Sequence, residues 1–424
     1  MRTPGSAGRK LVHVSEHTHT PSDFTSGAPE RGEARRRRAA LVAGLRERGA
    51  LKSREVERAM LAVPRHRFVP AVGVKAAYQD EVIVTKRDSE GEPISSASQP
   101  SIVACMLEQL DVRAGHRVLE IGAGTGYNAA LLAELVGETG AVTTVDLDAD
   151  SIRQARKALA ATGYDRVRVV HGDGEYGYDD DAPYDRIIVT VGTWDLPPAW
   201  WAQLAEGGRL VAPLQIRSSE HSIAFEYSGG VMRSRSIVCC GFMPMRGLGA
   251  HESQTVELSE GRILTFHTDR EVAAEGARGL LDERGTTVWT GVRLLPGDEV
   301  AQLSLWLACA FTGYGRMSAP FADHGALRLL LRWANPAVVD GGDFAYVACR
   351  RAGDGDRTEV GVRGHGPTAE VLALKVAEQI QVWDRECRGQ VRLRLEAHPS
   401  DSGPIAAGRF VVPKRHSRLA ILVE

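Results

Sequence analysis

The sequence is poor in cysteine and has no long apolar run. Its six cysteines include no Cys-x-x-Cys pair, which argues against both a zinc site and a disulfide framework. Free thiols in a reducing cytosol fit this usage better. No stretch of about 18 apolar residues is present, and the N-terminus has no apolar segment of the kind found in secretory signals. We therefore expect a cytoplasmic protein with no bound metal and no membrane partner.

A strong charge of either sign is also absent. The net charge is −2 at pH 7 and the pI is about 6.7, so no global field draws the chain to nucleic acid or to an anionic membrane. The basic run at residues 35–38 leads into a helical pattern, and we interpret it as a solvated helix start rather than a nucleic-acid arm. No nucleic-acid partner is expected.

The length of 424 residues predicts two or three domains, because domains typically have about 100–200 residues. Residues 1–34 are rich in Ser, Thr, Pro, Gly and His and have almost no periodic apolar signal, which predicts a disordered leader. A change of pattern near residue 250 divides the rest into a domain of residues 35–250 and a C-terminal domain of residues 251–424.

Short apolar strands alternate with helical patterns through most of the first domain. This alternation is typical of parallel β-α-β units and predicts an α/β fold with a doubly wound, mostly parallel sheet. Residues 223–227 and 237–242 predict two closing antiparallel strands. The other predicted strands are 117–121, 141–145, 167–170, 185–191 and 208–213, and the predicted helices are 101–110, 127–136, 151–161, 199–204 and two short helices within 39–60.

The C-terminal domain has a different pattern, which predicts an α+β arrangement. Its last helix, 368–388, has Val371, Leu374, Val376 and Ile380 on its apolar side. No chemical motif stands out in this domain, so we expect it to recognise the substrate. The other predicted helices are 271–283 and 299–311, and the predicted strands are 344–350, 358–362 and 391–396.

Three glycines, Gly122, Gly124 and Gly126, stand between an apolar strand and a helix. Glycine allows a tight turn and the close approach of a ligand, and the helix N-terminus offers free N–H groups. A plain β-α turn is the alternative interpretation. The next strand ends in Asp146, whose carboxylate suits the ribose hydroxyls of a nucleoside. The third strand ends in Asp173-Gly174, where the carboxylate suits an adenine amine.

The spacing Gly-x-Gly-x-Gly lacks the third glycine of the dinucleotide fingerprint, which disfavours an NAD-dependent enzyme. A nucleoside without phosphate fits better, and we predict S-adenosylmethionine as the cofactor. Glu120, just before the loop, is expected to belong to this cofactor site by tying the loop through backbone contacts. These features predict the class I S-adenosylmethionine-dependent methyltransferase fold. A non-catalytic nucleoside-binding scaffold is the alternative from another class.

A series of short motifs runs along the first domain. They are Val-Pro-Arg-His at 63–66, Phe-Val-Pro at 68–70, Ala-Tyr-Gln-Asp at 77–80, Ser-Gln-Pro at 98–100, Val-Leu-Glu-Ile-Gly-Ala-Gly-Thr-Gly-Tyr at 118–127, Gly-Asp-Gly at 172–174, Pro-Tyr-Asp at 183–185 and Gly-Gly-Arg-Leu-Val at 207–211. With these motifs in this order, the chain resembles the protein-L-isoaspartate (D-aspartate) O-methyltransferase family over about residues 40–247. Motifs of this kind before the glycine loop are absent from most other methyltransferases.

The resemblance implies methyl transfer from S-adenosylmethionine to an aspartyl or isoaspartyl carboxylate, followed by closure of a succinimide. A carboxylate is already ionised at neutral pH, so alignment and exclusion of water suffice and no general base is required. The resemblance places Ser98 beside the substrate carboxylate; an N-cap of the following helix is an equal and compatible role. Substrate contacts are expected from Tyr78, Ser96, Gln99 and Trp194, with a buried structural tyrosine as the alternative for Tyr78.

The sequence departs from the family in three places. Residues 86–96 are longer and more polar than the family's short link, Trp194 stands where the family has small alanines, and about 175 residues follow the methyltransferase domain. A surface aromatic packed on the following prolines is the alternative for Trp194. The extended architecture resembles homologues found with ribosomally made, modified peptides such as graspetides and lanthipeptides. The expected partner is therefore a peptide or protein with an Asp or isoAsp residue, a macrocyclic precursor being one candidate. General repair of isoaspartyl proteins is the competing hypothesis.

Overall fold

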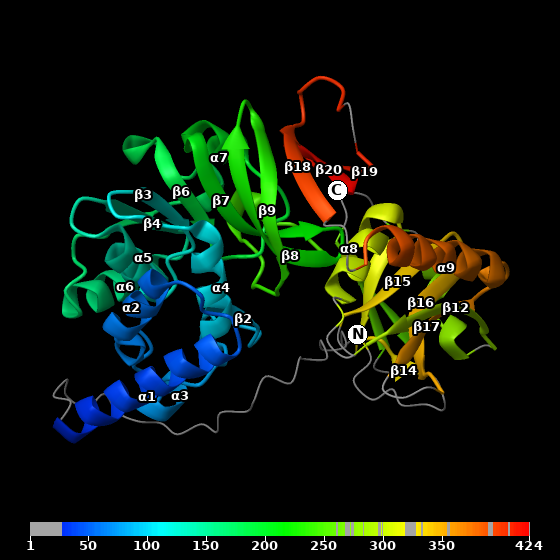
Figure 1. The fold of residues 1–424 in the computed structure, drawn as a ribbon, viewed down its shortest axis with the longest axis horizontal. Coiled ribbons are helices and arrows are strands. Elements are labelled where there is room, and N and C mark those ends of the chain that lie inside the picture. Colours follow the sequence, from blue (N-terminus) through cyan, green and yellow to red (C-terminus); the bar gives the residue numbers. More distant parts are fainter. Residues whose placement is uncertain are drawn as a thin grey trace.

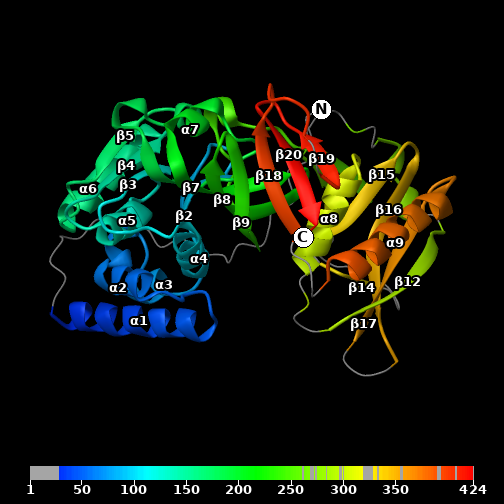
Figure 2. The ribbon, with the colours of Figure 1, turned by 45° about the horizontal axis from the view of Figure 1, so that its top comes forward.

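The computed structural model describes residues 28–259, 262–267, 272, 275–282, 284–295, 298, 300–318, 328–331, 334–353, 357–388, 393–405 and 408–423. In this part of the chain two large β-sheets lie beside each other, each with helices packed against it (Figures 1 and 2). None of the described helices has the length and apolar character needed to cross a membrane.

The larger sheet contains the methyltransferase strands. It is built from β3 (Arg117–Ile121), β4 (Ala141–Asp146), β5 (Arg168–His171), β6 (Tyr184–Val189), β7 (Leu204–Ile216), β8 (Ser219–Ser228), β9 (Val231–Cys239), β18 (Leu393–Pro399), β19 (Phe410–Pro413) and β20 (Ser417–Val423). The strand order is β5-β4-β3-β6-β7-β8-β9-β18-β20-β19. The neighbouring strands in the run β5-β4-β3-β6-β7 pair in parallel, and the other neighbours in the sheet pair antiparallel. The predicted doubly wound α/β fold is confirmed.

Helices link most of the parallel strands as predicted: α5 (Tyr127–Val136) joins β3 to β4, α6 (Ala149–Ala161) joins β4 to β5, and α7 (Pro198–Gln203) joins β6 to β7. Helix α4 (Pro100–Leu110) leads into β3, and two 3-10 turns lie between β5 and β6. Helix α5 buries eight of its ten residues, which explains its nearly continuous apolar sequence. Helix α6 begins with a side-chain cap, in which Asp148 accepts a hydrogen bond from Ser151 N.

The N-terminal segment folds into a layer of helices under α4 and α5 (Figure 2). It comprises α1 (Ala28–Glu47), α2 (Arg54–Ala62), the 3-10 turn η1 (Arg65–Arg67) and α3 (Val74–Ala77). Because α1 begins at Ala28, the predicted disordered leader of residues 1–34 is wrong for residues 28–34, and residues 1–27 lie outside the described residues. Ala34 is buried and Arg37 pairs with Glu33 one turn earlier, so a helix forms despite the polar sequence.

The smaller sheet is antiparallel throughout. Its strands are β10 (Gln254–Ser259), β11 (Arg262–Phe266), β12 (Thr286–Leu294), β13 (Tyr314–Ser318), β14 (Arg328–Leu329), β15 (Asn335–Asp340), β16 (Asp343–Arg351) and β17 (Thr358–His365), and its helices are α8 (Val300–Ala310) and α9 (Ala369–Glu386). The strand order is β10-β11-β13-β15-β16-β17-β12, with β14 beside β16. This is the predicted α+β arrangement. The predicted helix 271–283 is wrong within its described residues, which form 3-10 turns at Glu275–Ala277 and Leu280–Asp282.

The predicted boundary at residue 250 does not separate two independent bodies. Strand β18 pairs with β9 and β20 pairs with β18, so β18, β20 and β19 extend the methyltransferase sheet rather than the smaller one. The predicted C-terminal domain of residues 251–424 is corrected accordingly, because its last three strands belong to the first sheet.

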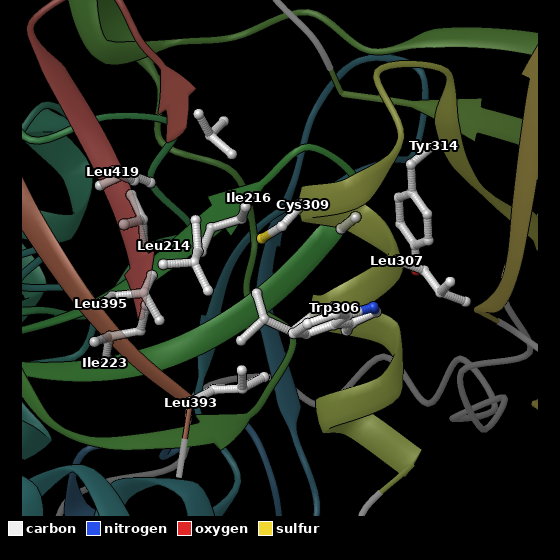
Figure 3. Close-up of a cluster of buried hydrophobic side chains, with 14 of the residues drawn as sticks. Leu214, Ile216, Ile223, Trp306, Leu307, Cys309, Tyr314, Leu393, Leu395 and Leu419 are labelled. Carbon is white, nitrogen blue, oxygen red and sulfur yellow. The ribbon is translucent and has the colours of Figure 1, made fainter. Parts of the chain in front are cut away.

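One apolar core runs through the junction of the two parts (Figure 3). Helix α8 presents Trp306 and Cys309 toward Leu214 and Ile223 of the large sheet and toward Leu395 of β18. All five side chains are at most 5% exposed. The methyltransferase part and the C-terminal part are therefore stabilised by the same buried contacts.

Helix α9 buries only part of its apolar side. Val376 and Ile380 are buried as predicted, whereas Val371 and Leu374 are 53% and 52% exposed. The prediction that all four lie on one apolar side is wrong, because at 3.6 residues per turn Val371 and Leu374 lie on the side of the helix away from Val376 and Ile380.

Candidate active site

The glycine loop lies at the carboxyl end of β3 and opens α5. Gly122, Gly124 and Gly126 all have positive φ angles, of 100°, 49° and 82°. A Cβ on Gly122 would come within 2.6 Å of Thr190 Oγ1, which itself donates a hydrogen bond of 2.8 Å to Gly122 O. Thr190, at the end of the neighbouring strand β6, therefore fixes the loop, a contact that nothing in the sequence pattern indicated.

Asp146, at the end of β4, faces the same loop. Its Oδ2 accepts a hydrogen bond from Gly124 N at 2.9 Å, and its Oδ1 accepts one from Asp148 N at 2.9 Å. The carboxylate is half-buried, and each oxygen keeps a further acceptor site. The structure thus brings together Asp146 and the glycines as predicted, and leaves the carboxylate able to accept hydrogen bonds from ribose hydroxyls.

Asp173 caps the turn that follows β5. It accepts hydrogen bonds from Glu175 N at 3.0 Å and from Leu248 N at 2.8 Å. A Cβ on Gly174 would lie within 2.4 Å of Ile121 and 3.0 Å of Met245, so only glycine fits there. Asp173 and Gly174 therefore join the end of β5 to residues 245–248, at the end of the sheet where an adenine is expected.

Glu120 does not reach the ligand side of the loop. It is fully buried, and its two oxygens accept hydrogen bonds from Asn128 Nδ2 at 2.8 Å and Thr144 Oγ1 at 2.6 Å. Burial raises the pKa of Glu120 to about 7. The prediction that Glu120 ties the loop through backbone contacts is corrected: its oxygens bond to the side chains of Asn128 and Thr144, so it holds α5 to β4 and is a positioning residue.

Ser98 lies in the turn between the β1–β2 hairpin and α4, and its backbone carbonyl accepts a hydrogen bond from Arg65. The buried Arg65 donates hydrogen bonds of 3.0 Å from Nη2 to Ser98 O and from Nε to Ala77 O. Its guanidinium carbon also lies 5.0 Å from the ring centroid of Tyr127, the first residue of α5. Arg65 thus links the Ser98 segment to the helix that follows the glycine loop. The sequence pattern did not indicate this role, although Arg65 belongs to the Val-Pro-Arg-His motif.

The N-cap of α4 is Gln99, with no side-chain capping bond, so the alternative role of Ser98 as this cap is not observed. Asp80 takes the place of a cap, because its Oδ1 accepts a hydrogen bond from Ser101 N at 2.8 Å. Tyr78 is buried and its hydroxyl lies 2.9 Å from His66 Nδ1. The predicted substrate contact of Tyr78 is therefore corrected to the structural alternative.

The polar segment before Ser98 forms a hairpin of β1 (Ile83–Arg87) and β2 (Pro93–Ala97). Ser96 O lies 3.8 Å from the position of a Cβ on Gly124, so the hairpin lies against the glycine loop. Lys86 Nζ donates hydrogen bonds to Asp148 Oδ2 at 2.6 Å and Asp150 Oδ2 at 3.0 Å. These contacts fasten the hairpin to the turn that follows Asp146. The substrate roles of Ser96 and Gln99 stay predictions, and both residues are half-buried.

Trp194 is buried between two residues of the C-terminal part. Its ring stacks on His251 with a centroid separation of 3.7 Å, and Lys414 Nζ lies 2.9 Å from its centroid. Asp195 accepts hydrogen bonds from His416 N at 2.6 Å and Ser417 Oγ at 2.5 Å. The alternative of a surface aromatic is wrong, since Trp194 is 8% exposed. The substrate contact of Trp194 stays a prediction.

A parallel sheet with a glycine loop after its first strand and a carboxylate after the second defines a class I S-adenosylmethionine-dependent methyltransferase. The sequence model of "Protein-L-isoaspartate(D-aspartate) O-methyltransferase (PCMT)" matches residues 36–248. The chain belongs to this family.

Relatives with that function are similar over their whole length. The protein-L-isoaspartate O-methyltransferase of Methanopyrus kandleri is 44% identical over 215 residues, covering 50% of this chain and 92% of the relative. That of Methanosarcina mazei is 40% identical over 244 residues, covering 58% and 97%. A solved protein-L-isoaspartate O-methyltransferase covers 85% of this chain and 96% of its own, at 24% identity and a TM-score of 0.48.

The protein is thus an S-adenosylmethionine-dependent carboxyl O-methyltransferase acting on protein isoaspartyl groups. The residues present fit this cofactor, because Gly126 leaves the first turn of α5 without a side-chain cap and Asp146 is half-exposed beside it. When bound, the cofactor supplies an electrophilic methyl group. The chain has to position a carboxylate in line with it and exclude water.

Proposed function

We propose that this enzyme esterifies an Asp or isoAsp carboxylate of a particular polypeptide partner, which its C-terminal part recognises. The ester is then attacked by the following backbone nitrogen, giving a succinimide or, after hydrolysis, isoaspartate. A ribosomally made peptide, cyclised before methylation, is the candidate substrate. The cysteines are free among the described residues, which suits a reducing, cytoplasmic setting.

The site roles in this proposal follow the geometry above. The glycine loop, whose lack of side chains lets a ligand approach closely, borders the methionine end of the cofactor, the Asp146 carboxylate holds its ribose, and Asp173 and Gly174 border the adenine. Ser98 orients the substrate carboxylate by donating a hydrogen bond, while Arg65 holds the Ser98 backbone in place. No side chain is required as a base, because the carboxylate is ionised at neutral pH.

A contact between the C-terminal part and the active-site region supports the proposal of a dedicated substrate. The turn between β19 and β20 places Lys414 over Trp194 and joins His416 to Asp195, on the segment that follows β6 and the loop-fixing Thr190. The C-terminal part is therefore in direct contact with one flank of the active site. A general repair enzyme, which has to accept many unrelated sequences, does not need such a contact.

General repair is the second candidate, and a specific observation favours it. The relatives named as protein-L-isoaspartate O-methyltransferases are up to 44% identical and are covered almost completely by this chain. The methyltransferase part alone therefore contains what those enzymes have.

The two candidate functions predict different rates of methylation of an unrelated isoaspartyl hexapeptide by this enzyme. With radiolabelled S-adenosylmethionine, we expect kcat/KM to be about 100-fold below that of the Methanopyrus kandleri enzyme measured alongside, which equals about 2.7 kcal/mol of transition-state stabilisation. Equal values for the two enzymes would establish general repair instead. If calorimetry detects no binding of S-adenosylmethionine, both candidates fail.

A further inference from the structure

The smaller sheet has a long strand at one edge. Strand β12 has nine residues and, among the described strands, pairs with β17 alone, at the end of the strand order. Figure 2 shows it at the outer margin of the sheet, beside α9. An edge strand presents unpaired main-chain N–H and C=O groups, and soluble proteins normally shorten or cover such strands.

Other edge strands in the described residues are either covered by hydrogen bonds or short. At the opposite edge of the same sheet, Gly279 N bonds to Leu258 O of β10 at 2.9 Å, and Gln254 exchanges two hydrogen bonds with the backbone of Val272. The edges of the large sheet, β5 and β19, have four residues each, and β19 ends in a proline. Along β12, Gln381 Nε2 donates to Thr290 O and Arg388 Nη2 donates to Arg293 O at 2.7 Å, both beyond Trp289. Within the described part of the chain, no comparable bond to the backbone covers residues 286–289.

Helix α9 forms a wall along this edge. Val371 and Leu374, its two exposed apolar residues, line a groove of about 380 Å³ together with Val288 of β12. The other lining residues are Lys375, Ala377, Glu378 and Gln381. The groove is thus lined by four apolar residues and by three polar or charged ones.

The regular part of the edge is short and has a defined end. Residues 286–289 pair with β17 in unbroken register, and the register shifts beyond Trp289. Gly291 there has a φ of 76°, and Gln381 Nε2 donates a hydrogen bond of 2.9 Å to Thr290 O. The bulge and the glutamine side chain stop an added strand at this point, so the open stretch is residues 286–289.

We propose that the groove between β12 and α9 binds an extended segment of the polypeptide substrate as an added β-strand. The occupant is a polypeptide because only a main chain matches the spacing of the unpaired groups along 286–289. Alternate side chains of the segment pack against Val288, Val371 and Leu374, since side chains alternate across a strand. The proposal rests on the proposed function, because it gives the C-terminal part the task of holding a chosen partner away from the methylated residue.

The binding test uses the full chain and a phage-displayed library of random peptides about twelve residues long. Enriched peptides are expected to have apolar residues at alternate positions. Labelled with fluorescein, such a peptide should bind the parent protein and lose at least tenfold in affinity, about 1.4 kcal/mol, on Val371→Glu/Leu374→Glu. Both side chains are more than half exposed, and the first substitution adds an acid in the first turn of α9, which a helix N-terminus favours, so we expect the fold to be retained.

Two controls make this test specific. Leu61→Glu replaces an equally apolar, 38% exposed residue on α2 and should leave peptide binding unchanged. Two versions of the peptide carry backbone N-methyl groups, one at the odd and one at the even positions. One version should lose binding and the other should keep it, because only one of these two sets of N–H groups faces β12. Failure to enrich peptides, binding unaffected by the double substitution, or pairing of two copies through β12 seen by sedimentation would each overturn the proposal.

A second experiment connects docking to catalysis. The enriched peptide is joined to an isoaspartyl hexapeptide by a flexible glycine-serine linker. KM for the joined peptide should be at least about tenfold below that of the hexapeptide alone, with kcat unchanged, because tethering raises the local concentration. The double substitution should remove this difference. If the hexapeptide is not methylated at any concentration, the proposed function fails; if it is methylated but joining gives no advantage, only the docking proposal fails.

Discussion

At the scale of single residues, Glu120 is a carboxylate shut away from water beneath the cofactor loop. Burial raises its pKa to about 7, although hydrogen bonds from Thr144 and Asn128 oppose this shift. The folded protein therefore binds a proton that the unfolded chain releases above pH 4.5. The free energy of unfolding should fall as pH rises from 4.5 to 7, by up to about 3 kcal/mol from this group.

Glu120→Gln is expected to remove this contribution, because an amide of the same shape does not ionise and still accepts the bond from Asn128. Urea unfolding of the parent and the variant, measured at steps between pH 4.5 and 8, tests it. The parent should lose stability relative to the variant across this range. Parallel curves for the two proteins would show that Glu120 does not titrate in the folded state.

For Ser98, the family resemblance gives a role beside the substrate carboxylate, and the structure shows what holds its backbone. Its carbonyl is held by Arg65, which leaves the hydroxyl free for a role toward substrate. We expect Ser98→Ala to lower kcat by about 10- to 100-fold, the cost of one hydrogen bond to a charged group, about 1.5–3 kcal/mol. The Kd of S-adenosylmethionine should be unchanged in calorimetry. Ser95→Ala, on the same hairpin and bonded to Thr85, is the matched control and should retain full activity.

At the scale of elements, the β1–β2 hairpin is expected to stabilise cofactor binding through Lys86. The ammonium joins the hairpin to Asp148 and Asp150, next to the carboxylate that faces the glycine loop. Because Lys86 is 32% exposed, the ion pairs are partly screened by solvent. Lys86→Ala should therefore weaken S-adenosylmethionine binding by only about threefold to fivefold, or about 1 kcal/mol.

Calorimetry at low and high salt checks this prediction. High salt should bring the parent close to the variant, because the ion pairs are screened. Arg87→Ala, which removes only a bond to Gly91 O within the hairpin, is the control and should bind like the parent. An equal loss for both variants would show that Lys86 has no special part in holding the hairpin.

The elements that could be predicted from sequence are those set by local periodicity. The strands and helices from β3 to α7 were found because apolar runs and glycines mark them within a few residues. The β1–β2 hairpin was not predicted as strands, because its apolar residues, such as Ile83 and Ile94, are few and do not alternate regularly with polar ones. The side chain that fastens it, Lys86, bonds to Asp148 and Asp150, 62 and 64 residues away along the chain. For the same reason Thr190 and Arg65 were missed: their roles depend on contacts 68 and 33 residues away along the chain.

At the scale of the whole molecule, the order of strands could not be predicted. The pairing of β18 with β9 joins residues about 160 positions apart, such as Glu396 and Arg233. No local pattern distinguishes a strand that returns to the first sheet from one that extends the second. The apparent boundary at residue 250 is therefore a change in sequence pattern and not a gap in the core.

This continuity leads to a prediction about truncation. A chain ending at residue 250 would lose β18 to β20 and α8, which exposes the edge of β9 and the apolar side chains of Leu214, Ile216 and Ile223. Each such side chain contributes about 1.5–3 kcal/mol when fully buried, so the loss approaches the whole stability of a typical domain, about 5–15 kcal/mol. We expect the truncated chain to be aggregated, or to unfold more than about 10 °C below the full chain.

Near-ultraviolet circular dichroism during heating measures the unfolding temperature of the truncated and full chains, and sedimentation measures whether the truncated chain is aggregated. A second variant keeps the chain intact and replaces Leu395 by aspartate, which places a charge in the shared core on β18. It should destabilise both parts together and give one transition at lower temperature. Two separate transitions, with the methyltransferase part unfolding at the temperature of the parent, would show that the parts are independent. A single lowered transition would show that the substrate-facing C-terminal part and the catalytic sheet unfold as one unit.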